Sequence, residues 1–466
     1  MEGQMKKIIS LLIILSVILS LVSCNFISDI AVGKSPTING VSIKEYTIVY
    51  DAEGLDYNLR AAEYIKAQAE ERFGVELAMV DDSEAQADYE IVVGETSRPI
   101  SAELDAECEG LQFAMMAKNG SVALEGDYFI IAAAAYFFVD SYMPKDGGDF
   151  LLEDSVIVRD PIVKEAKNFI LLIGDGMGFN HTKSFDYVDT DVEYSDGEDF
   201  FYGYLLPNQG ESRTNSLSGT TDSAAGGTAL SCGQKTYNGY VGIDRNMEDM
   251  KSLTELAFEK GMSAGVMSTE TKTGATPASF SSHADSRNST AGIILSQAQS
   301  QKAYGTIIDC GYDYYTKNYM TVIEKHITDT LDKLDDNENG FFLMYEEAHI
   351  DKHSHNNNLN EMFYAIVRFN QAIGRFMEYA FYHPDTFVLI TADHETGDLY
   401  LDGDEFMYHS GDHTSKNVPV FAWGTGSELW NGKKVENVQI PQTIASFMGD
   451  DNFGDQTSYK RLNLTK

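Results

Sequence analysis

The segment Phe169-Ile170-Leu171-Leu172-Ile173-Gly174-Asp175-Gly176-Met177-Gly178 decides the fold that we expect for this chain. Its first five residues form a continuous apolar run, which is typical of a central parallel strand buried on both faces. Open α/β sheets collect ligands at the carboxyl ends of their strands. Asp175 stands at such an end, and the flanking glycines predict room for a metal ion beside it. A tight Gly-Asp-Gly turn with no ligand is the alternative interpretation.

Three later segments repeat this combination of an apolar run with polar side chains beside it. The runs are residues 341–345, 387–390 and 418–424, and we expect the third to be the last strand. Glu346 follows the first run, Asp393-His394 follows the second, and His413 stands shortly before the third. Asp351 and His355 are four residues apart, so they share one face of a helical turn and form a workable pair for zinc.

The stretch Thr221-Asp222-Ser223-Ala224-Ala225-Gly226-Gly227-Thr228-Ala229 predicts a helix that begins at Ser223. Free N–H groups at a helix N-terminus attract anions. The Ser223 hydroxyl is a candidate nucleophile, but it needs a base or a metal ion to activate it. The Gly-x-Ser-x-Gly motif of triad hydrolases is absent around it. An ordinary helix start with serine as its cap is the alternative.

The segment Gly274-Ala275-Thr276-Pro277 predicts a second helix N-terminus, with Thr276 at the cap and proline in the first turn. We expect this helix to carry both His283 and Arg287. The Arg287 guanidinium could donate two hydrogen bonds to a phosphate group. A solvated surface arginine is the alternative.

Residues from about 36 to 160 have the pattern of a separate α+β unit. It contains expected strands at 46–50 and 91–93, a helix over 59–73, a hairpin at Asn119-Gly120 and a buried helix over 127–141. The pattern faintly resembles small accessory domains that precede some glycoside hydrolases. We find no metal-ligand cluster or nucleophile in this unit and assign it no chemistry.

Residues 1–24 are typical of a bacterial export signal. Two lysines precede an apolar run from 8 to 22, which is short for a membrane span. The run ends Leu21-Val22-Ser23-Cys24, which resembles a lipoprotein cleavage box, so Cys24 is the expected lipidation site. We therefore expect an exported, lipid-anchored protein at the cell surface or on a periplasm-facing membrane, with a tether from about 25 to 40. An ordinary secretory signal is the alternative, and translation could also begin at Met5.

Composition narrows the function further. The chain has 34 Lys and Arg against 72 Asp and Glu, a net charge of −38, which disfavours nucleic-acid binding and would repel anionic substrates. A phosphate site therefore needs strong local positive charge, which metal ions can supply. If Cys24 carries lipid, three cysteines remain, and their odd number argues against a disulfide framework. Seven of the ten histidines lie between His349 and His413. We interpret four of these as bystanders or partners of ligands: His349, His353, His383 and His409.

The motifs stand in the order seen in alkaline phosphatases, and the chain resembles that family over about residues 165–450. The matching segments are 173–178, 221–225, 275–277, Glu346 with Asp351-Lys352 and His355, 391–394, and His413-Thr414; residues 233–239 also look like the segment after the family's nucleophile. Six matches in order are not a credible coincidence. The resemblance implies an α/β three-layer sandwich with a central, mostly parallel sheet.

The resemblance also implies two zinc ions and one magnesium ion. One zinc would be held by Asp351, His355 and His413; the other by Asp175, Asp393 and His394; and the magnesium by Asp175, Thr276 and Glu346. This division agrees with ligand chemistry, because imidazole-containing sets suit zinc and oxygen-only sets suit magnesium.

The same resemblance assigns roles to the remaining motif residues. Ser223 would be the nucleophile that forms a phosphoserine, and Arg287 would clamp the phosphate, oriented by Asp222. Lys352 would be a further substrate-binding residue. Two departures stand out. Gly274 replaces the aspartate or histidine that relatives carry beside the magnesium waters, and only about nineteen residues separate His394 from His413. The segment between His394 and His413 is too short for the large insert that many relatives have there. Dimer contacts built on such an insert cannot be assumed, although a homodimer is still possible.

We therefore predict a signal peptide over 1–24, a tether and small accessory domain over 25–160, and a catalytic domain over 161–466. The predicted function is hydrolysis of small phosphate monoesters by a membrane-anchored alkaline phosphatase. A phosphodiesterase or sulfatase of the same superfamily is one alternative. A sulfatase is disfavoured because Ala-Ala-Gly-Gly follows Ser223 in place of the x-Pro-x-Arg expected there. A catalytically idle surface binding protein is the other alternative.

Overall fold

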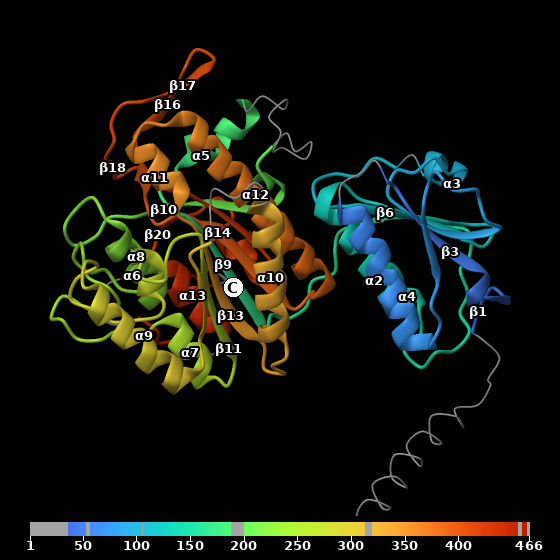
Figure 1. Ribbon diagram of the computed structural model, residues 1–466, viewed down its shortest axis with the longest axis horizontal. Helices are drawn as coiled ribbons and strands as arrows, with labels where there is room; N and C mark the ends of the chain where they lie inside the picture. The colour runs from blue at the N-terminus through green and yellow to red at the C-terminus, as the bar shows by residue number, and fades with distance from the viewer. Residues whose placement is uncertain are drawn as a thin grey trace, which may run out of the picture.

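The computed structural model describes residues 36–52, 56–104, 106–187, 200–312, 319–454 and 459–463 (Figure 1). Cys24, the export signal and most of the tether lie outside these ranges, so lipid anchoring stays a prediction. Among the helices within these ranges, none is long and apolar enough to cross a membrane.

One large sheet is built around the predicted central strand at residues 169–173. Its eight strands are, in spatial order, β12 (Ile307–Cys310), β11 (Ser263–Ser268), β13 (Phe341–Glu347), β9 (Asn168–Gly174), β14 (Thr386–Thr391), β19 (Val418–Trp423), β10 (Asn208–Arg213) and β20 (Lys434–Glu436). As predicted, β9 is central: Leu171 pairs in parallel with Met344 on one side and Leu389 on the other. The prediction that 418–424 is the last strand is wrong, because β20 follows and extends the sheet through buried Val435.

Helices cover both faces of this sheet (Figure 1). On one face, Ile170 and Leu172 belong to the same hydrophobic cluster as residues of α12 (Leu359–Tyr382) and α10 (Tyr319–Asp335). On the other, Leu171 and Ile173 share a cluster with residues of α7 (Leu253–Glu259) and α13 (Gln439–Phe447). The side chains of one strand alternate between faces, so a wholly apolar strand requires cover on both. The predicted three-layer sandwich is confirmed.

A second, six-stranded sheet lies in the earlier part of the chain. Its order is β4 (Ala78–Asp81), β3 (Tyr46–Tyr50), β5 (Tyr89–Val93), β7 (Ser121–Glu125), β6 (Phe113–Lys118) and β8 (Ser155–Arg159). The predicted hairpin at Asn119 and Gly120 joins β6 to β7, and both residues have positive φ, as a type I′ turn requires. The expected helices are α2 (Asp56–Phe73) and α4 (Ile131–Tyr142), the latter preceded by the short 3₁₀ helix η2 (Tyr128–Ile130).

The long helix α12 contacts both parts of the structure. It packs on the large sheet and also against α4 and η2. The Arg60 guanidinium of α2 pairs with the buried Glu378 carboxylate at 3.0 Å, and the ring of Phe129 lies 5.6 Å from that of Phe381. The small sheet is thus joined to the large one through a continuous apolar core.

The remaining α-helices and strands have ten residues or fewer, apart from the fifteen-residue helix α9. They are β1 (Thr37–Ile38), β2 (Val41–Ser42), α3 (Pro99–Glu103), α5 (Phe179–Lys183), α6 (Ser223–Cys232), α8 (Ala275–Ser279), α9 (Thr290–Tyr304), α11 (His349–His355), β15 (Glu395–Thr396), β16 (Leu399–Asp402), β17 (Glu405–Tyr408) and β18 (His413–Thr414). Of these, α6, α8, α11 and β18 carry candidate site residues.

Candidate metal centre and nucleophile

The candidate ligands converge on one edge of the large sheet because of strand direction. β11, β13, β9 and β14 run parallel, so the residues after them meet at a common edge. β19 is antiparallel to β14, which brings its amino end and the preceding His413 to the same edge. β10 is antiparallel to β19 in turn, so the segment after it delivers Ser223 there. The edge collects residues from six separate parts of the chain.

The glycines beside Asp175 let other parts of the chain approach the β9 loop closely, and the expectation that they leave room for a metal ion stays a prediction. A Cβ atom on Gly176 would lie 2.9 Å from the Asp351 Cα and 2.8 Å from the Thr396 hydroxyl. A Cβ on Gly174 would lie 2.9 Å from the Met177 sulfur. Gly176 also has φ +74°, a backbone conformation that favours glycine. Its small size lets α11 approach the β9 loop.

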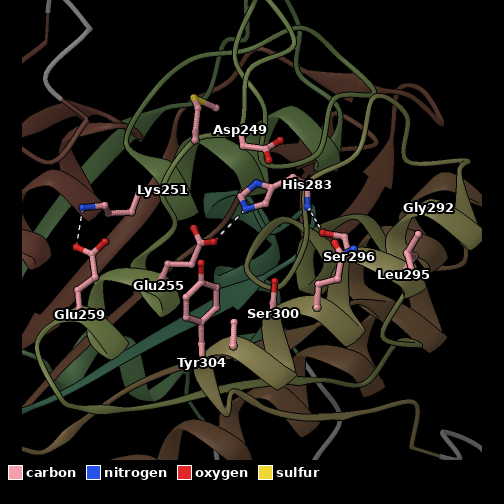
Figure 2. Close-up of a pocket in the computed structure, with 13 residues that line it drawn as sticks. Asp249, Lys251, Glu255, Glu259, His283, Gly292, Leu295, Ser296, Ser300 and Tyr304 are labelled. Carbon is pink, nitrogen blue, oxygen red and sulfur yellow. Dashed lines mark hydrogen bonds and ion pairs between the residues drawn. The ribbon is translucent and has the colours of Figure 1, made fainter.

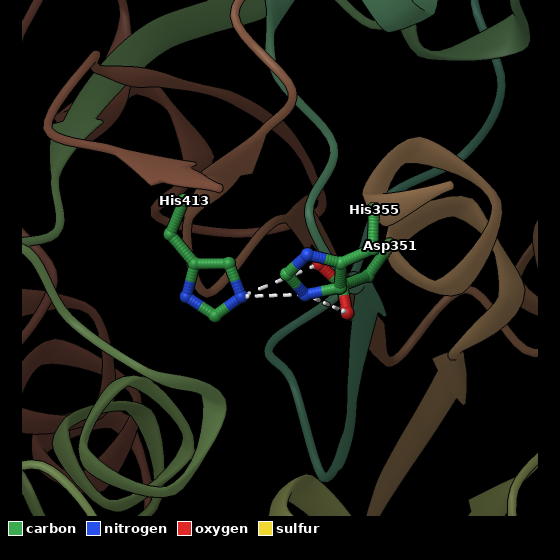
Figure 3. Close-up of side chains that lie close together, drawn as sticks. All are labelled: Asp351, His355 and His413. Carbon is green, nitrogen blue, oxygen red and sulfur yellow. Dashed lines mark hydrogen bonds and ion pairs between the residues drawn. The ribbon is translucent and has the colours of Figure 1, made fainter. Parts of the chain in front are cut away.

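The first ligand group consists of Asp351 and His355 on α11 with His413 on β18 (Figure 3). The Nε2 atoms of the two histidines lie 3.1 Å apart, and they lie 3.3 and 3.5 Å from the Asp351 carboxylate. The Nδ1–H of His355 donates to the Gly411 carbonyl at 2.6 Å, and that of His413 donates to the Thr221 carbonyl at 2.8 Å. Since a carbonyl only accepts, neutral rings present two facing Nε2 lone pairs, which require a proton or a cation between them.

The second group consists of Asp175, Asp393 and His394, all buried. The His394 Nε2 atom lies 3.5 Å from Asp175 Oδ1 and 3.2 Å from Asp393 Oδ2. Within the part of the chain that the structure describes, both of these oxygens are buried without a hydrogen bond. The Thr396 hydroxyl donates to Asp351, so at 3.2 Å it can only accept from the His394 Nδ1–H. His394 Nε2 therefore also carries a lone pair, which faces the carboxylates and could bind a metal ion.

A third set of atoms contains oxygen alone. Thr276 Oγ1 and Glu346 Oε1 are buried and have no hydrogen-bond partner among the described residues. Leaving such groups unpaired costs about 1–3 kcal/mol each. A hard cation would satisfy them, and a carboxylate with a hydroxyl is a donor set that magnesium accepts.

The electrostatics of the site favour bound cations. Burial, and after it the charge of Asp393, raise the pKa of Asp175 well above its usual range. Burial, and after it the charge of Glu270, raise the pKa of Glu346 to about 8. Burial also acts on Asp351, but hydrogen bonds from His355 and His413 outweigh it and hold the pKa of that carboxyl well below its usual range. Several carboxylates can be ionised here together only with positive charge between them.

Ser223 lies beside the second histidine-containing group. Helix α6 begins at Ser223, as predicted, but the cap is Asp222, which accepts a hydrogen bond from the Ala225 N–H at 3.0 Å. The interpretation of Ser223 as a mere capping serine is therefore wrong. Its Oγ lies 3.2 Å from His394 Nε2, and the His394 ring stacks on the His413 ring at 3.7 Å.

Arg287 reaches the site from a loop, which corrects the expected helix over 276–287. Helix α8 ends at Ser279, and its cap is Gly274, so Thr276 lies inside the first turn. The Ser281 and Ser282 hydroxyls bond to carbonyls of the last turn, and such local bonds compete with helix continuation. The Arg287 guanidinium donates to Asp222 at 3.2 Å, the contact that the resemblance implied.

His283 belongs to a different feature, a hollow that also includes residues of α7 and α9 (Figure 2). Its Nε2 atom pairs with Glu255 at 3.1 Å, and its Nδ1 atom bonds to the Gly242 carbonyl at 2.8 Å. The prediction that one helix carries both His283 and Arg287 is therefore wrong, because α8 ends at Ser279 before either residue. The four histidines predicted to be bystanders are outside both ligand groups, and three of them pair with other carboxylates: His349 with Glu347, His383 with Asp335 and His409 with Asp398.

Lys352 contacts Glu270, a residue near the site that the sequence patterns did not identify. Its Nζ atom pairs with Glu270 at 3.1 Å. Glu270 follows β11 at the ligand-bearing edge, and that position, two residues after a buried strand, is the signal that could have identified it. Thr396, which orients His394, lies on the short strand β15 that follows β14.

Comparison with known proteins identifies the family. The model of the family described as alkaline phosphatase matches residues 166–311 and 316–408, just over half of the chain. The chain belongs to the alkaline phosphatase family. The match begins at residue 166, so the six-stranded sheet lies before it. Membership of this family supports a phosphoesterase activity.

Individual relatives agree with this membership. Alkaline phosphatase 3 of Bacillus subtilis is 28% identical over 354 residues, which cover 65% of this chain and 73% of the relative. Alkaline phosphatase from the Antarctic bacterium TAB5 is 26% identical with a TM-score of 0.54, and the match covers 61% of this chain and 99% of that one. A variant of the Antarctic enzyme has magnesium bound in the site called M3; it is 26% identical with a TM-score of 0.53 and covers 62% and 99% of the two chains.

Stabilisation by divalent cations should grow between about pH 7 and 9. A hydrogen bond to Asp351 raises the pKa of His355 to about 9, against 6.5 ordinarily, and the pKa of Glu346 is about 8 against 4.5. In this range both groups hold more protons in the folded, metal-free protein than in the unfolded chain, so the free energy of unfolding of that form falls as pH rises. Cations replace these protons.

The measurement is the difference in unfolding temperature between metal-loaded and chelated protein across this pH range. Lys235, whose pKa burial lowers to about 8, has the opposite dependence. It pairs with Glu436, away from the ligands, so it contributes equally to both forms and cancels. A difference that stays constant or shrinks with pH would contradict the assignment of these groups as cation ligands.

Proposed function

We propose that this protein hydrolyses phosphate monoesters through a phosphoserine at Ser223, with two zinc ions and one magnesium ion bound at the ligand edge. The observation that supports the proposal most strongly is the orientation of three imidazole rings. Each has its Nδ1 proton committed to a neighbour, and each Nε2 atom faces carboxylate oxygens within 3.5 Å. Such an arrangement is typical of metal-binding histidines.

The donor atoms favour particular metals. Each histidine-containing group suits zinc, and the oxygen set of Thr276 and Glu346, extended by Asp175, suits magnesium. When bound, these cations would neutralise charge on phosphate oxygens and favour the ionised form of the serine hydroxyl. The chain's net charge of −38 makes such local compensation necessary for an anionic substrate.

The protein's own residues then perform the displacement. Ser223 Oγ attacks phosphorus, the bond from phosphorus to the ester oxygen breaks, and the alcohol leaves. Water hydrolyses the phosphoserine in a second displacement, which releases inorganic phosphate and restores Ser223. The first N–H groups of α6 would donate to the equatorial oxygens, since the Asp222 cap accepts from the later Ala225 N–H. Asp222 also holds Arg287 in position to donate to the same oxygens.

The location of the enzyme is part of the proposal. An exported protein anchored through a lipid on Cys24 would meet phosphate esters outside the cytoplasm. Whether two copies associate is left open, since the sequence has no large insert between His394 and His413.

Replacing the proposed nucleophile should remove activity and leave metal binding intact. Ser223→Ala is expected to keep the metal content of the wild type and to lose at least about a hundredfold in kcat, because Ser223 supplies the hydroxyl that forms the covalent intermediate. Ser231→Ala, a buried serine of the same helix, is the matched control and should keep full activity. Acid quenching with labelled substrate should place label on the wild type and the control alone. Label elsewhere, or full activity of Ser223→Ala, would overturn the assignment.

Substrate preference tests the monoester part of the proposal. A diester places an alkyl group where a charged oxygen belongs, and this leaves a cationic donor such as Arg287 unpaired. That mismatch costs about 1–3 kcal/mol, or tenfold to several hundredfold in rate. We expect kcat/KM for 4-nitrophenyl phosphate to exceed that for its methyl diester by at least this factor, and Arg287→Ala to narrow the preference. A preference for the diester would assign the protein to another activity of the superfamily.

A further inference from the structure

Glu270 lies close to the oxygen-only ligand set, although the motifs of the site do not include it. Its backbone N–H donates to the Ser268 hydroxyl at 2.9 Å, and that hydroxyl donates to the Glu346 carboxylate. Burial, and after it the charge of Glu270, raise the pKa of Glu346, and the charge of Glu270 also contributes to the raised pKa of Asp175. Glu270 is therefore a third carboxylate directed at the same small region.

Gly274 shows where the Glu270 side chain lies. A Cβ atom at position 274 would be 2.5 Å from Glu270 Oε2 and 2.6 Å from its carboxyl carbon. The carboxylate thus occupies the space that any side chain at 274 would need, at the start of the helix that carries Thr276. Gly274 has φ −56°, which every residue can adopt. Its backbone conformation does not require glycine, but a side chain at 274 would displace the Glu270 carboxylate from its present position.

Two buried oxygen atoms nearby have no hydrogen bond of ordinary geometry within the described residues, although the Thr276 hydroxyl lies close enough to Glu346 to lower the pKa of that carboxyl. Thr276 Oγ1 and Glu346 Oε1 are buried, at 1% and 0% residue exposure, and neither has a hydrogen bond among the residues that the structure describes. A carboxylate that approaches another carboxylate and unpaired oxygens is unfavourable unless a cation lies among them. Lys352 forms an ion pair with Oε1 of Glu270, while Oε2 is the atom turned toward Gly274.

We propose that Glu270 supplies a carboxylate oxygen, directly or through one water, to the cation bound by Thr276 and Glu346, and that Gly274 is small in order to admit it. This inference rests on the proposed function, since it concerns the third cation of that site. Glu270, which lies in the loop before α8, thus takes the place of the aspartate or histidine side chain that relatives have at the position of Gly274. Lys352 pairs with Oε1 of the same carboxylate, so its direct role is to position Glu270.

Magnesium binding to the zinc-loaded protein tests the proposal without using activity. Titration calorimetry should show that Glu270→Gln binds magnesium at least about tenfold more weakly than the wild type, the usual effect of removing a partner of a metal site. Zinc content should be unchanged. Glu259→Gln is the matched control, because Glu259 forms a similar partly exposed ion pair with Lys251 at 2.7 Å, and it should bind magnesium as the wild type does. Gly274→Ala should weaken binding too, because the added methyl displaces the carboxylate.

The outcomes separate this inference from the proposed function. Equal magnesium affinity in Glu270→Gln and the wild type would overturn the role of Glu270 and leave the phosphomonoesterase proposal standing. Loss of zinc together with magnesium in Glu270→Gln would also overturn it, because the residue would then support the whole site. A zinc-loaded, active wild type that binds no magnesium would overturn both this inference and the third cation.

Discussion

Three imidazole rings whose Nδ1 protons are already committed determine what this site can bind. His355 and His413 give these protons to backbone carbonyls, and His394 gives its proton to Thr396. Their Nε2 lone pairs must then face buried carboxylates and one another. The Ser223 hydroxyl is within hydrogen-bond distance of His394 Nε2, but it cannot offset the repulsion between the other lone pairs and the carboxylates that they face. The fold tolerates this arrangement because a positive charge can fill it.

The topology of the large sheet is what brings these groups together. Four parallel strands deliver loops to one edge, and the two strands of alternating direction, β19 and β10, return the chain so that His413 and Ser223 arrive at the same edge. The Thr221 carbonyl then binds His413 two residues before Ser223. This bond links the loop that carries Ser223 to the first ligand group. The Ser223 Oγ atom in turn lies 3.2 Å from His394 Nε2, which belongs to the second group.

Sequence patterns were sufficient for the features that depend on local chemistry. A fully apolar strand at 169–173 predicts burial on two faces, and the spacing of Asp351 and His355 predicts one helical face; the structure has both. The ends of elements were harder. The helix at Ala275 stops after five residues because serine hydroxyls take its carbonyls, and no apolar periodicity records that competition.

Glu270 illustrates a second limit. Its place in the site depends on the absence of a side chain four residues later, and on a lysine eighty-two positions away in the sequence. Gly274 has an ordinary φ and gives no turn signal in the sequence. Its role can be recognised only from the structure, where the Glu270 carboxylate lies in the space that a side chain at 274 would need. The small sheet is the converse case: its strands and hairpin follow the pattern closely, yet the sequence gives no sign that α12 would join it to the large sheet through one core.

The most direct test of this account is anomalous diffraction at the zinc edge from crystals grown with zinc and magnesium. The account predicts two strong peaks, one among Asp351, His355 and His413 and one among Asp175, Asp393 and His394, each contacted by Nε2 atoms. It would be contradicted by zinc bound elsewhere with both groups empty, since the facing imidazole nitrogens would then be held together by protons alone.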